Sequence, residues 1–418
     1  MEKNKPKIRF KGFEEEWIET SLNDVSSKVI DKNENREYEI VFTNSAEYGI
    51  IDQKHYFDRN IVNKDNIQGY YVVMPDDFVY NPRISTSAPV GPINRNKLSY
   101  TGVASPLYYV FRVKDGEMNL SYLDYFFKSP IWHNFMFQNG NSGARSDRFS
   151  INDNVFVKLP IQHPKSEEEQ RKIGALLTTL DKLIRKLELK LEKLRCIKQS
   201  LLKQMFTNVN GGGYAAPLIR FKNYNGEWQM SKLGYITERV VRKNSNLESS
   251  LPLTVSAQNG LIDQGEFFNS RIASKDVSGY YLIRKGEFAY NKSSSDGYPY
   301  GAIKRLDKYE KGVLSTLYIV FALNNSMVDS DYIVAFYDTN YWHEEIVKRA
   351  AEGARNHGLL NISAEDFFDT SIALPIDKNE QYEVGHYFIF LDKIITDNRE
   401  KLSKIRTMKQ SLLQKMFA

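Results

Sequence analysis

Two stretches of the chain have apolar residues spaced alternately four and three positions apart. The first stretch carries Ile173, Leu177, Leu180, Ile184, Leu187, Leu191 and Leu194. The second carries Val384, Phe388, Leu391, Ile395, Asn398, Leu402 and Ile405 in the same register. This spacing is typical of the apolar seam of a coiled coil. It predicts two long helical arms, over 166–207 and 377–418, and neither arm can bury its seam alone.

Before each arm the chain alternates short apolar runs with Gly, Asp and Pro, a pattern that predicts β-strands. Such runs are EIVFT at 39–43, YYVVM at 70–74, DFVYN at 77–81 and LYYVFRV at 107–113. Helical patterns follow at 120–137 and at 331–350. We therefore expect α+β domains with a strand-rich body, in which most of the Tyr and Phe side chains belong to the core.

The two halves of the chain are a tandem repeat. IRFKGFEEEW at 8–17 returns as IRFKNYNGEW at 219–228, and GVASPLYYVF at 102–111 returns as GVLSTLYIVF at 312–321. The offset is 210 or 211 nearly throughout, and it rises to about 215 where Leu-Pro at 159–160 is matched with Leu-Pro at 374–375. The repeat predicts strand-rich domains at 1–165 and 218–376, each followed by its arm, with a linker at 208–217. Gly211 to Gly213 favour a flexible linker, because a phosphate-binding loop would need a following lysine.

Pairing one arm with the other is the simplest way to cover both seams within one chain. At about 1.5 Å per residue, forty residues make a rod of roughly 60 Å. Antiparallel arms would place the two domains at opposite ends under a pseudo-twofold axis; a rod that only dimerises is the alternative. Asn398 replaces Leu187 in the second seam, and it either fixes the register of the pair or faces solvent.

Tracts that differ between the halves lie between framework segments that match. NPRISTSAPVG at 81–91 stands against NKSSSDGYPYG at 291–301, and GARSDRFSI at 143–151 stands against GARNHGLLNI at 353–362. Two copies of one fold with different polar tracts suit two readers of different short DNA sequences. The candidate DNA-binding residues are Arg83, Ser85, Arg145, Asp147, Arg148, Lys292, Ser293, Arg355, Asn356 and His357. Arg pairs with guanine edges and Asn with adenine, whereas Lys and Ser more often hold phosphates. Ordinary polar turns are the alternative, and a structural salt bridge is a further one for Arg145 and Arg355.

Charge and candidate chemistry narrow this picture. The 418-residue chain has a net charge of +5, but residues 1–165 carry 21 basic and 21 acidic side chains, and residues 208–376 carry 18 and 19. Domains this close to neutral would need partners to supply part of the contact with DNA phosphates. No nucleotide-binding loop and no Cys/His cluster is present, so we expect neither catalytic residues nor a metal site. Asn81-Pro82-Arg83 only approaches the Asn-Pro-Pro-aromatic motif of adenine methyltransferases.

Two histidines and the single cysteine bear on packing, and the overall composition bears on the cellular compartment. We interpret His133 and His343 as helix-packing residues, and Cys196, among Leu and Ile, as a buried thiol. A single cysteine, the absence of an apolar stretch of roughly 20 residues and the charged start of the chain favour a cytoplasmic protein without a membrane segment.

Taken together, these motifs resemble the specificity subunits of type I restriction-modification systems over essentially the whole chain. The opening IRFKGFEEEW, the GAR and LP motifs that close each domain, and the motifs of the arms carry the resemblance. In the first arm these are Glu169, Gln170, Leu180, Asp181, Lys182, Lys198, Gln199, Ser200, Leu201 and Leu202. In the second they are Glu380, Gln381, Leu391, Asp392, Lys393, Lys409, Gln410, Ser411, Leu412 and Leu413.

The resemblance implies two target recognition domains joined by two antiparallel coiled-coil helices. It implies a non-catalytic, sequence-specific DNA-binding subunit that reads a bipartite site in double-stranded DNA. It also implies two modification (methyltransferase) subunits and two restriction (translocase and nuclease) subunits as partners. S-adenosylmethionine, ATP and magnesium would bind those partners and not this chain. The alternatives are a coiled-coil protein adaptor that does not read DNA and an enzyme, such as a nuclease, with an unrecognised site.

Overall fold

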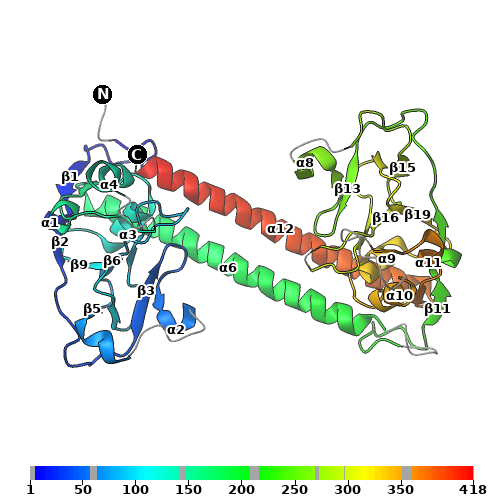
Figure 1. Ribbon diagram of the computed structural model, residues 1–418, viewed down its shortest axis with the longest axis horizontal. Coiled ribbons are helices and arrows are strands. Elements are labelled where there is room, and N and C mark those ends of the chain that lie inside the picture. The colour runs from blue at the N-terminus through cyan, green and yellow to red at the C-terminus, as the bar shows by residue number, and fades with distance from the viewer. Residues whose placement is uncertain are drawn as a thin grey trace. The chain divides into compact units, whose positions relative to one another are not determined.

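The computed structural model describes residues 5–56, 64–141, 147–207, 216–268, 273–295, 297–350 and 360–417. The chain divides into two compact units. The first comprises 1–188 and 400–418, and the second comprises 189–399. Each unit therefore contains one strand-rich domain and a part of each long helix (Figure 1).

Among its described residues, the strand-rich body of the first unit is built from two four-stranded sheets and a two-stranded one. Its strands are β1 (Ile18–Ser21), β2 (Ser26–Lys28), β3 (Val41–Ser45), β4 (Gly49–Asp52), β5 (Tyr71–Val73), β6 (Phe78–Tyr80), β7 (Ile93–Arg95), β8 (Gly102–Ala104), β9 (Tyr109–Val113) and β10 (Pro160–His163). Its helices are α1 (Leu22–Val25), α2 (Gln53–Tyr56), the 3-10 helix η1 (Lys64–Gly69), α3 (Leu120–Lys128), α4 (His133–Asn139), α5 (Asp153–Phe156) and the long α6 (Glu167–Met205), which continues into the second unit. The sheet orders are β2-β9-β6-β7, β4-β3-β8-β5 and β1-β10. The β3–β8 pair is parallel, and the other pairs of these sheets are antiparallel.

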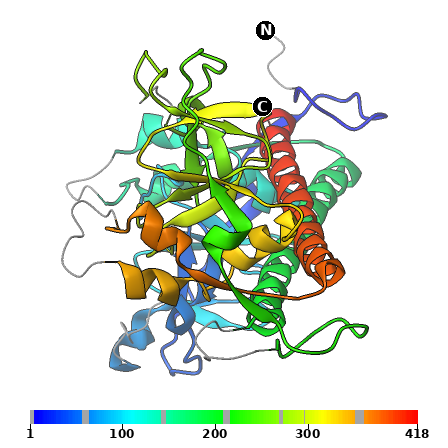
Figure 2. The same ribbon diagram turned by 90° about the vertical axis from the view of Figure 1, so that its right-hand side faces the viewer.

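The second unit repeats this plan, except that its described strands form one four-stranded sheet and three two-stranded ones. Its strands are β11 (Gln229–Lys232), β12 (Thr237–Arg239), β13 (Leu253–Ser256), β14 (Gly260–Asp263), β15 (Tyr281–Arg284), β16 (Phe288–Asn291), β17 (Ala302–Arg305), β18 (Lys311–Leu314), β19 (Ile319–Leu323) and β20 (Ser371–Leu374). Its helices are α7 (Leu233–Ile236), α8 (Gln264–Phe268), α9 (Ser330–Tyr337), α10 (His343–Arg349), α11 (Ala364–Phe368) and the long α12 (Lys378–Met416), which continues into the first unit. Figure 2 shows this unit with its elements coloured from green through yellow to orange along the chain. The sheet β12-β19-β16-β17 matches β2-β9-β6-β7 strand for strand. The predicted α+β tandem repeat is thus confirmed.

The aromatic cores of the two units correspond pair by pair. Phe78 stacks on Phe111 with ring centroids 5.3 Å apart, and Phe288 stacks on Phe321 at the same distance. In the same way, the Tyr80 ring stacks on Phe156 of α5, and the Tyr290 ring on Phe367 of α11, both at 4.9 Å. These paired contacts join the central sheet to the short helix after the variable tract, so the scaffold around each tract is the same.

The strand registers correct the match of the two Leu-Pro pairs. Ser21 pairs with Pro160 in the first unit, and Lys232 pairs with Ser371 in the second, so the offset is still 211 here. The true counterpart of Pro375 is Pro164, because the side chains of Gln170 and Gln381 each donate to the carbonyl of these prolines at 2.9 Å. The match of 159–160 with 374–375 is a coincidence of sequence.

Each helical pattern at 120–137 and 331–350 is divided into two helices. In the first unit α3 ends before Ser129-Pro130, because proline cannot continue a helix. In the second, α9 ends at Tyr337 and α10 begins at His343, although no proline intervenes. The rings of His133 and His343 lie 4.6 and 4.5 Å from the preceding tryptophans, and burial lowers the pKa of both histidines.

The long helices pack antiparallel within each unit. In the first unit Lys409 of α12 binds Asp181 of α6, and Arg406 binds Glu188, so the partners run in opposite directions along the two helices. In the second unit Lys198 of α6 binds Asp392 of α12 at 2.6 Å. The pairs Lys409–Asp181 and Lys198–Asp392 each join the LDK segment of one arm (180–182 and 391–393) to the KQSLL segment of the other (409–413 and 198–202), which explains why both arms carry both motifs.

The seam side chains lie between the helices or against the domains. All of those listed above are buried except Ile184, Leu194 and Asn398, which are half-buried. The amide of Asn398 donates to the Ile394 carbonyl of its own helix at 2.7 Å. The interpretation of Cys196 was wrong, because its thiol is exposed. Cys196 lies two positions beyond Leu194 of the seam, which turns it about 200° away on the helix.

The ion pair of Asp181 predicts how stability depends on pH. Burial alone would raise the pKa of Asp181, but hydrogen bonds from Lys409 and Tyr125 lower it below its ordinary value. An aspartate with a lowered pKa stabilises the folded state fully above its unfolded pKa of about 3.9, and this contribution is lost as the pH falls through the folded pKa. We therefore expect the urea midpoint of the wild type to fall more steeply below about pH 4 than that of Asp181→Asn. Parallel pH profiles of the two proteins would contradict this.

Candidate nucleic-acid interface

In the first unit, the tracts 81–91 and 147–151 lie together as a short antiparallel ribbon. The Phe149 amide donates to the Pro82 carbonyl at 2.8 Å, and the Ile84 amide donates to the Asp147 carbonyl at 3.0 Å. Between these two bonds, Arg83 lies directly opposite Arg148. The structure thus joins into one surface the two tracts that were selected only because they differ between the halves.

The tip of the first tract is a tight hairpin that both units share. Ser85 and Ala88 exchange backbone hydrogen bonds, and Ser295 and Tyr298 do the same in the second unit. Gly91 closes the tract with a φ of +84°, and a Cβ atom there would lie 2.2 Å from the Asn81 carbonyl oxygen. Gly301 repeats this close approach in the second unit. The backbone of this tract is therefore kept while its side chains change.

The candidate side chains of the first ribbon face outward. The Arg83 side chain is 70% exposed, and its Nε lies 4.0 Å from Oδ2 of Asp147, which is also exposed. Ser85 is exposed, and Arg148 is half-buried. Arg145 lies outside the described residues. Of the five candidates in the first unit, the structure brings four together.

A hollow of about 320 Å³ lies beside this ribbon. Tyr71, Tyr108 and Tyr109 line it together with Arg148 and Lys28. Lys28 forms an ion pair with Asp153 of α5 at 2.5 Å, and burial with the nearby Asp153 carboxylate raises the pKa of Tyr109 to about 12. The tyrosine therefore stays protonated at neutral pH. Aromatic faces with a neighbouring cation can stack on bases or hold a nucleic-acid backbone.

The second unit keeps one bond of the ribbon and changes its side chains. The Leu360 amide donates to the Lys292 carbonyl at 3.0 Å, as Phe149 does to Pro82. The Lys292 ammonium donates to the Ile362 carbonyl at 3.3 Å, so this candidate is partly engaged within the domain. Ser293 is exposed at the position that matches Arg83. The candidates Arg355, Asn356 and His357 lie outside the described residues.

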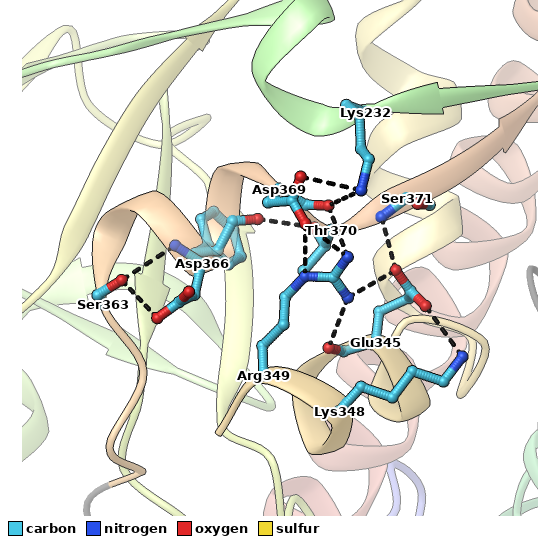
Figure 3. Close-up of polar contacts among 10 residues, drawn as sticks. Lys232, Glu345, Lys348, Arg349, Ser363, Asp366, Asp369, Thr370 and Ser371 are labelled. Atoms are coloured by element: carbon cyan, nitrogen blue, oxygen red, sulfur yellow. Dashed lines mark hydrogen bonds and ion pairs between the residues drawn. The ribbon is translucent and has the colours of Figure 1, made fainter. Parts of the chain in front are cut away.

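The sequence did not predict an ion-pair cluster beside the tract that follows α10 in the second unit (Figure 3). Arg349, the last residue of α10, binds Glu345 one turn earlier at 2.8 Å and Asp369, just after α11, at 2.8 Å. Glu345 also accepts the amide of Ser371 at 2.9 Å, and Asp369 binds Lys232 at 2.9 Å. The cluster holds together the two ends of the tract that follows α10. The sequence contained the Glu345–Arg349 spacing, but such a pair on a helix is usually solvated.

Charge within this cluster is compensated. Burial alone would raise the pKa of Glu345, but the Ser371 amide and the cations Lys348 and Arg349 lower it below its ordinary value. The side chain of Glu345 is almost fully buried. A buried carboxylate with these partners is a structural group and not a proton donor at neutral pH.

The motifs shared by both halves also form structural contacts. Arg9 of IRFK binds Glu169 with two hydrogen bonds of 2.7 and 2.8 Å, and Arg220 binds Glu380 at 2.5 and 2.7 Å. Both glutamates are fully buried. Each long helix therefore begins at a bidentate ion pair with the opening segment of its own domain. The repeated motifs build the scaffold, whereas the tracts that differ carry the exposed side chains.

The described part of the chain contains no group of three or more His, Cys, Asp or Glu side chains placed to hold a metal ion. Within the same residues, no helix is long and apolar enough to cross a membrane.

Comparisons with known proteins agree with this geometry. Residues 14–194 match the family model of the type I restriction modification DNA specificity domain. The fold is similar to the crystal structure of the type I restriction-modification S subunit from M. genitalium, with a TM-score of 0.60 and 14% identity over 99% of both chains. The HsdS subunit from Thermoanaerobacter tengcongensis matches with a TM-score of 0.46 and 15% identity over 96% of both chains. A comparison with curated proteins found no match.

The matched residues cover nearly all of the first domain and about two thirds of its arm. The second half repeats the order of the main elements, the strand order of the central sheet and the buried ion pair at the start of its arm. Residues 14–194 therefore form a type I restriction modification DNA specificity domain, and the second half of the chain repeats its fold.

Proposed function

We propose that this chain reads a bipartite site in double-stranded DNA, one half-site with each strand-rich domain. The observation that carries the proposal is the pair of matched hairpins at 81–91 and 291–301, which have one backbone and different exposed side chains. A shared scaffold gives both domains the same way of approaching DNA, and the exchanged side chains give them different base preferences.

The proposal includes partners that carry out the chemistry. In it, two modification subunits use S-adenosylmethionine to methylate adenine, and two restriction subunits use ATP and magnesium to translocate and cleave DNA. The chain itself contributes binding and no catalytic group, and it acts in the cytoplasm, where that DNA is found. Apolar side chains are exposed on the helices of the second unit, such as Ile197, Tyr382 and Phe390. Their exposure supports the proposal that partner subunits cover these helices.

Methylation mapping tests this proposal. The full chain is expressed with a modification subunit that assembles with it, in a host without adenine methylation, and methylated adenines are located across the genome. We expect a single split motif that disappears when the chain is omitted. If the complex assembles but no methylation depends on the chain, the adaptor function replaces DNA reading.

A further inference from the structure

Arg83 and Arg148 occupy a special position in the ribbon of the first domain. The hydrogen bonds that flank them run from Ile84 to Asp147 and from Phe149 to Pro82, so the two arginines form a non-hydrogen-bonded pair. Residues in such a pair have Cα atoms about 4.5 Å apart and side chains on the same face. The neighbouring Phe149 is buried, and successive side chains of a strand point to opposite faces. The two guanidinium groups therefore project from the face of the ribbon opposite to Phe149.

Among the described residues of the domain, a single long ion pair compensates this arrangement. Like charges directly opposite one another destabilise an antiparallel pair. Asp147 lies at the limit of an ion pair with Arg83, at 4.0 Å, and it is more than half exposed. Within the described residues 5–56, 64–141 and 147–207, neither guanidinium group donates a hydrogen bond to another residue. Residues that break a local rule of stability are expected at functional sites.

We propose that Arg83 and Arg148 read two guanines in the half-site of the first domain, an inference that rests on the proposed function. The major groove, about 12 Å wide, admits a two-stranded ribbon, and a guanidinium donates two hydrogen bonds to O6 and N7 of guanine. Because the two side chains start side by side, the guanines belong to base pairs that are adjacent or separated by one pair. Asp147, on the opposite strand of the ribbon, orients the Arg83 side chain.

The second domain differs at this position. Ser293 takes the place of Arg83, although the neighbouring backbone bond from Leu360 to Lys292 is kept. A serine hydroxyl cannot make the two-bond contact that selects guanine. The paired guanines are therefore a property of the first half-site alone.

The test compares the DNA preferences of Arg83→Ala, Arg148→Ala and the wild type, using the full chain in complex with its modification subunit and a pool of randomised duplex DNA. We expect each variant to lose its preference for guanine at one position of one and the same half-site. The loss of discrimination is expected to be about 5-fold to about 150-fold. Lys158→Ala, which removes one exposed charge from the same domain, is the matched control and should leave the motif unchanged.

Four outcomes overturn the inference while leaving the proposed function intact. The first is a wild-type site with no two G·C pairs placed as described in either half. The second is weaker binding of the arginine variants to all sequences with an unchanged motif, which indicates phosphate contacts. The third is a loss of guanine preference in different half-sites for the two variants. The fourth is an unchanged motif and affinity.

Preserved recognition of the other half-site shows that a variant is folded. A wild-type complex that selects no motif contradicts the proposed function itself.

Discussion

Replacing Phe206 with alanine is expected to lower the free energy of unfolding of the second unit by about 3–5 kcal/mol. Phe206 follows the last turn of α6, and its side chain is only 2% exposed. Its ring lies 5.2 Å from Tyr332, 5.8 Å from Phe388 and 6.3 Å from Trp228. Truncation would leave a cavity among these rings, which packing around a fixed helix end cannot readily close.

The measurement is urea unfolding of the full chain, with hydrogen exchange used to assign the loss to peptides of residues 218–399. Phe390→Ala is the matched control, because its ring is 56% exposed on α12 of the same unit. An exposed position of this kind should change stability by no more than about 0.5 kcal/mol. If the two variants are equally stable, the helix end does not anchor the unit.

Phe417 has the corresponding position in the first unit. It follows α12, and its ring lies 5.3 Å from Tyr122 and 6.4 Å from Phe126. Each arm thus ends in the core of the unit formed around the other domain. Met205 and Phe206 at the end of the first arm and Met416 and Phe417 at the end of the second are all buried for this reason.

Local and periodic features of this fold could be predicted from the sequence. The four-and-three spacing requires a helical partner for each arm, and the repeat requires two copies of one domain, so both were predicted without tertiary information. The predicted strand at 39–43 is found two residues later, at Val41–Ser45, because the pairing of β3 with β4 and β8 decides where it begins. Strand ends depend on such partners and are less local than strand identity.

Contacts between residues distant in sequence could not be predicted. Nothing in the tracts 81–91 and 143–151 shows that Arg83 and Arg148 oppose one another, because the bridge joins residues separated in the chain by β7, β8, β9, α3 and α4. The cluster around Arg349 was missed for a related reason. Its partner Asp369 is brought near only by the fold of α10 against α11. The sequence could therefore predict which residues belong to the candidate site but not how they lie relative to one another.

The same geometry explains why shared residues maintain the scaffold whereas variable residues present different side chains. Changes in the hairpin tip leave the glycine and asparagine that fix its backbone untouched, so new side chains can be presented without rebuilding the domain. Changes in the buried ion pairs at the helix starts would instead affect the whole unit. Recognition can therefore vary between the halves while the motifs that anchor the arms stay the same.

Removing the guanidinium of Arg220 is expected to destabilise the second unit by about 3–5 kcal/mol. Glu380 is fully buried, and Arg220 neutralises it with bonds of 2.5 and 2.7 Å. Arg220→Ala would leave this carboxylate buried without its cation, although Trp228 still donates to it at 3.4 Å. The expected loss is therefore mainly the cost of an unpaired buried charge, and urea unfolding measures it.

A double variant separates that cost from the value of the ion pair itself. Arg220→Met with Glu380→Met replaces both charges by apolar side chains, and it should be more stable than Arg220→Ala, because a buried pair exchanged for apolar groups is often neutral. Lys285→Ala, which breaks the exposed pair with Glu310, should cost at most about 1 kcal/mol and is the control for losing a cation. If the double variant is as unstable as Arg220→Ala, the hydrogen bonds of the pair, and not charge compensation, hold α12 to its domain.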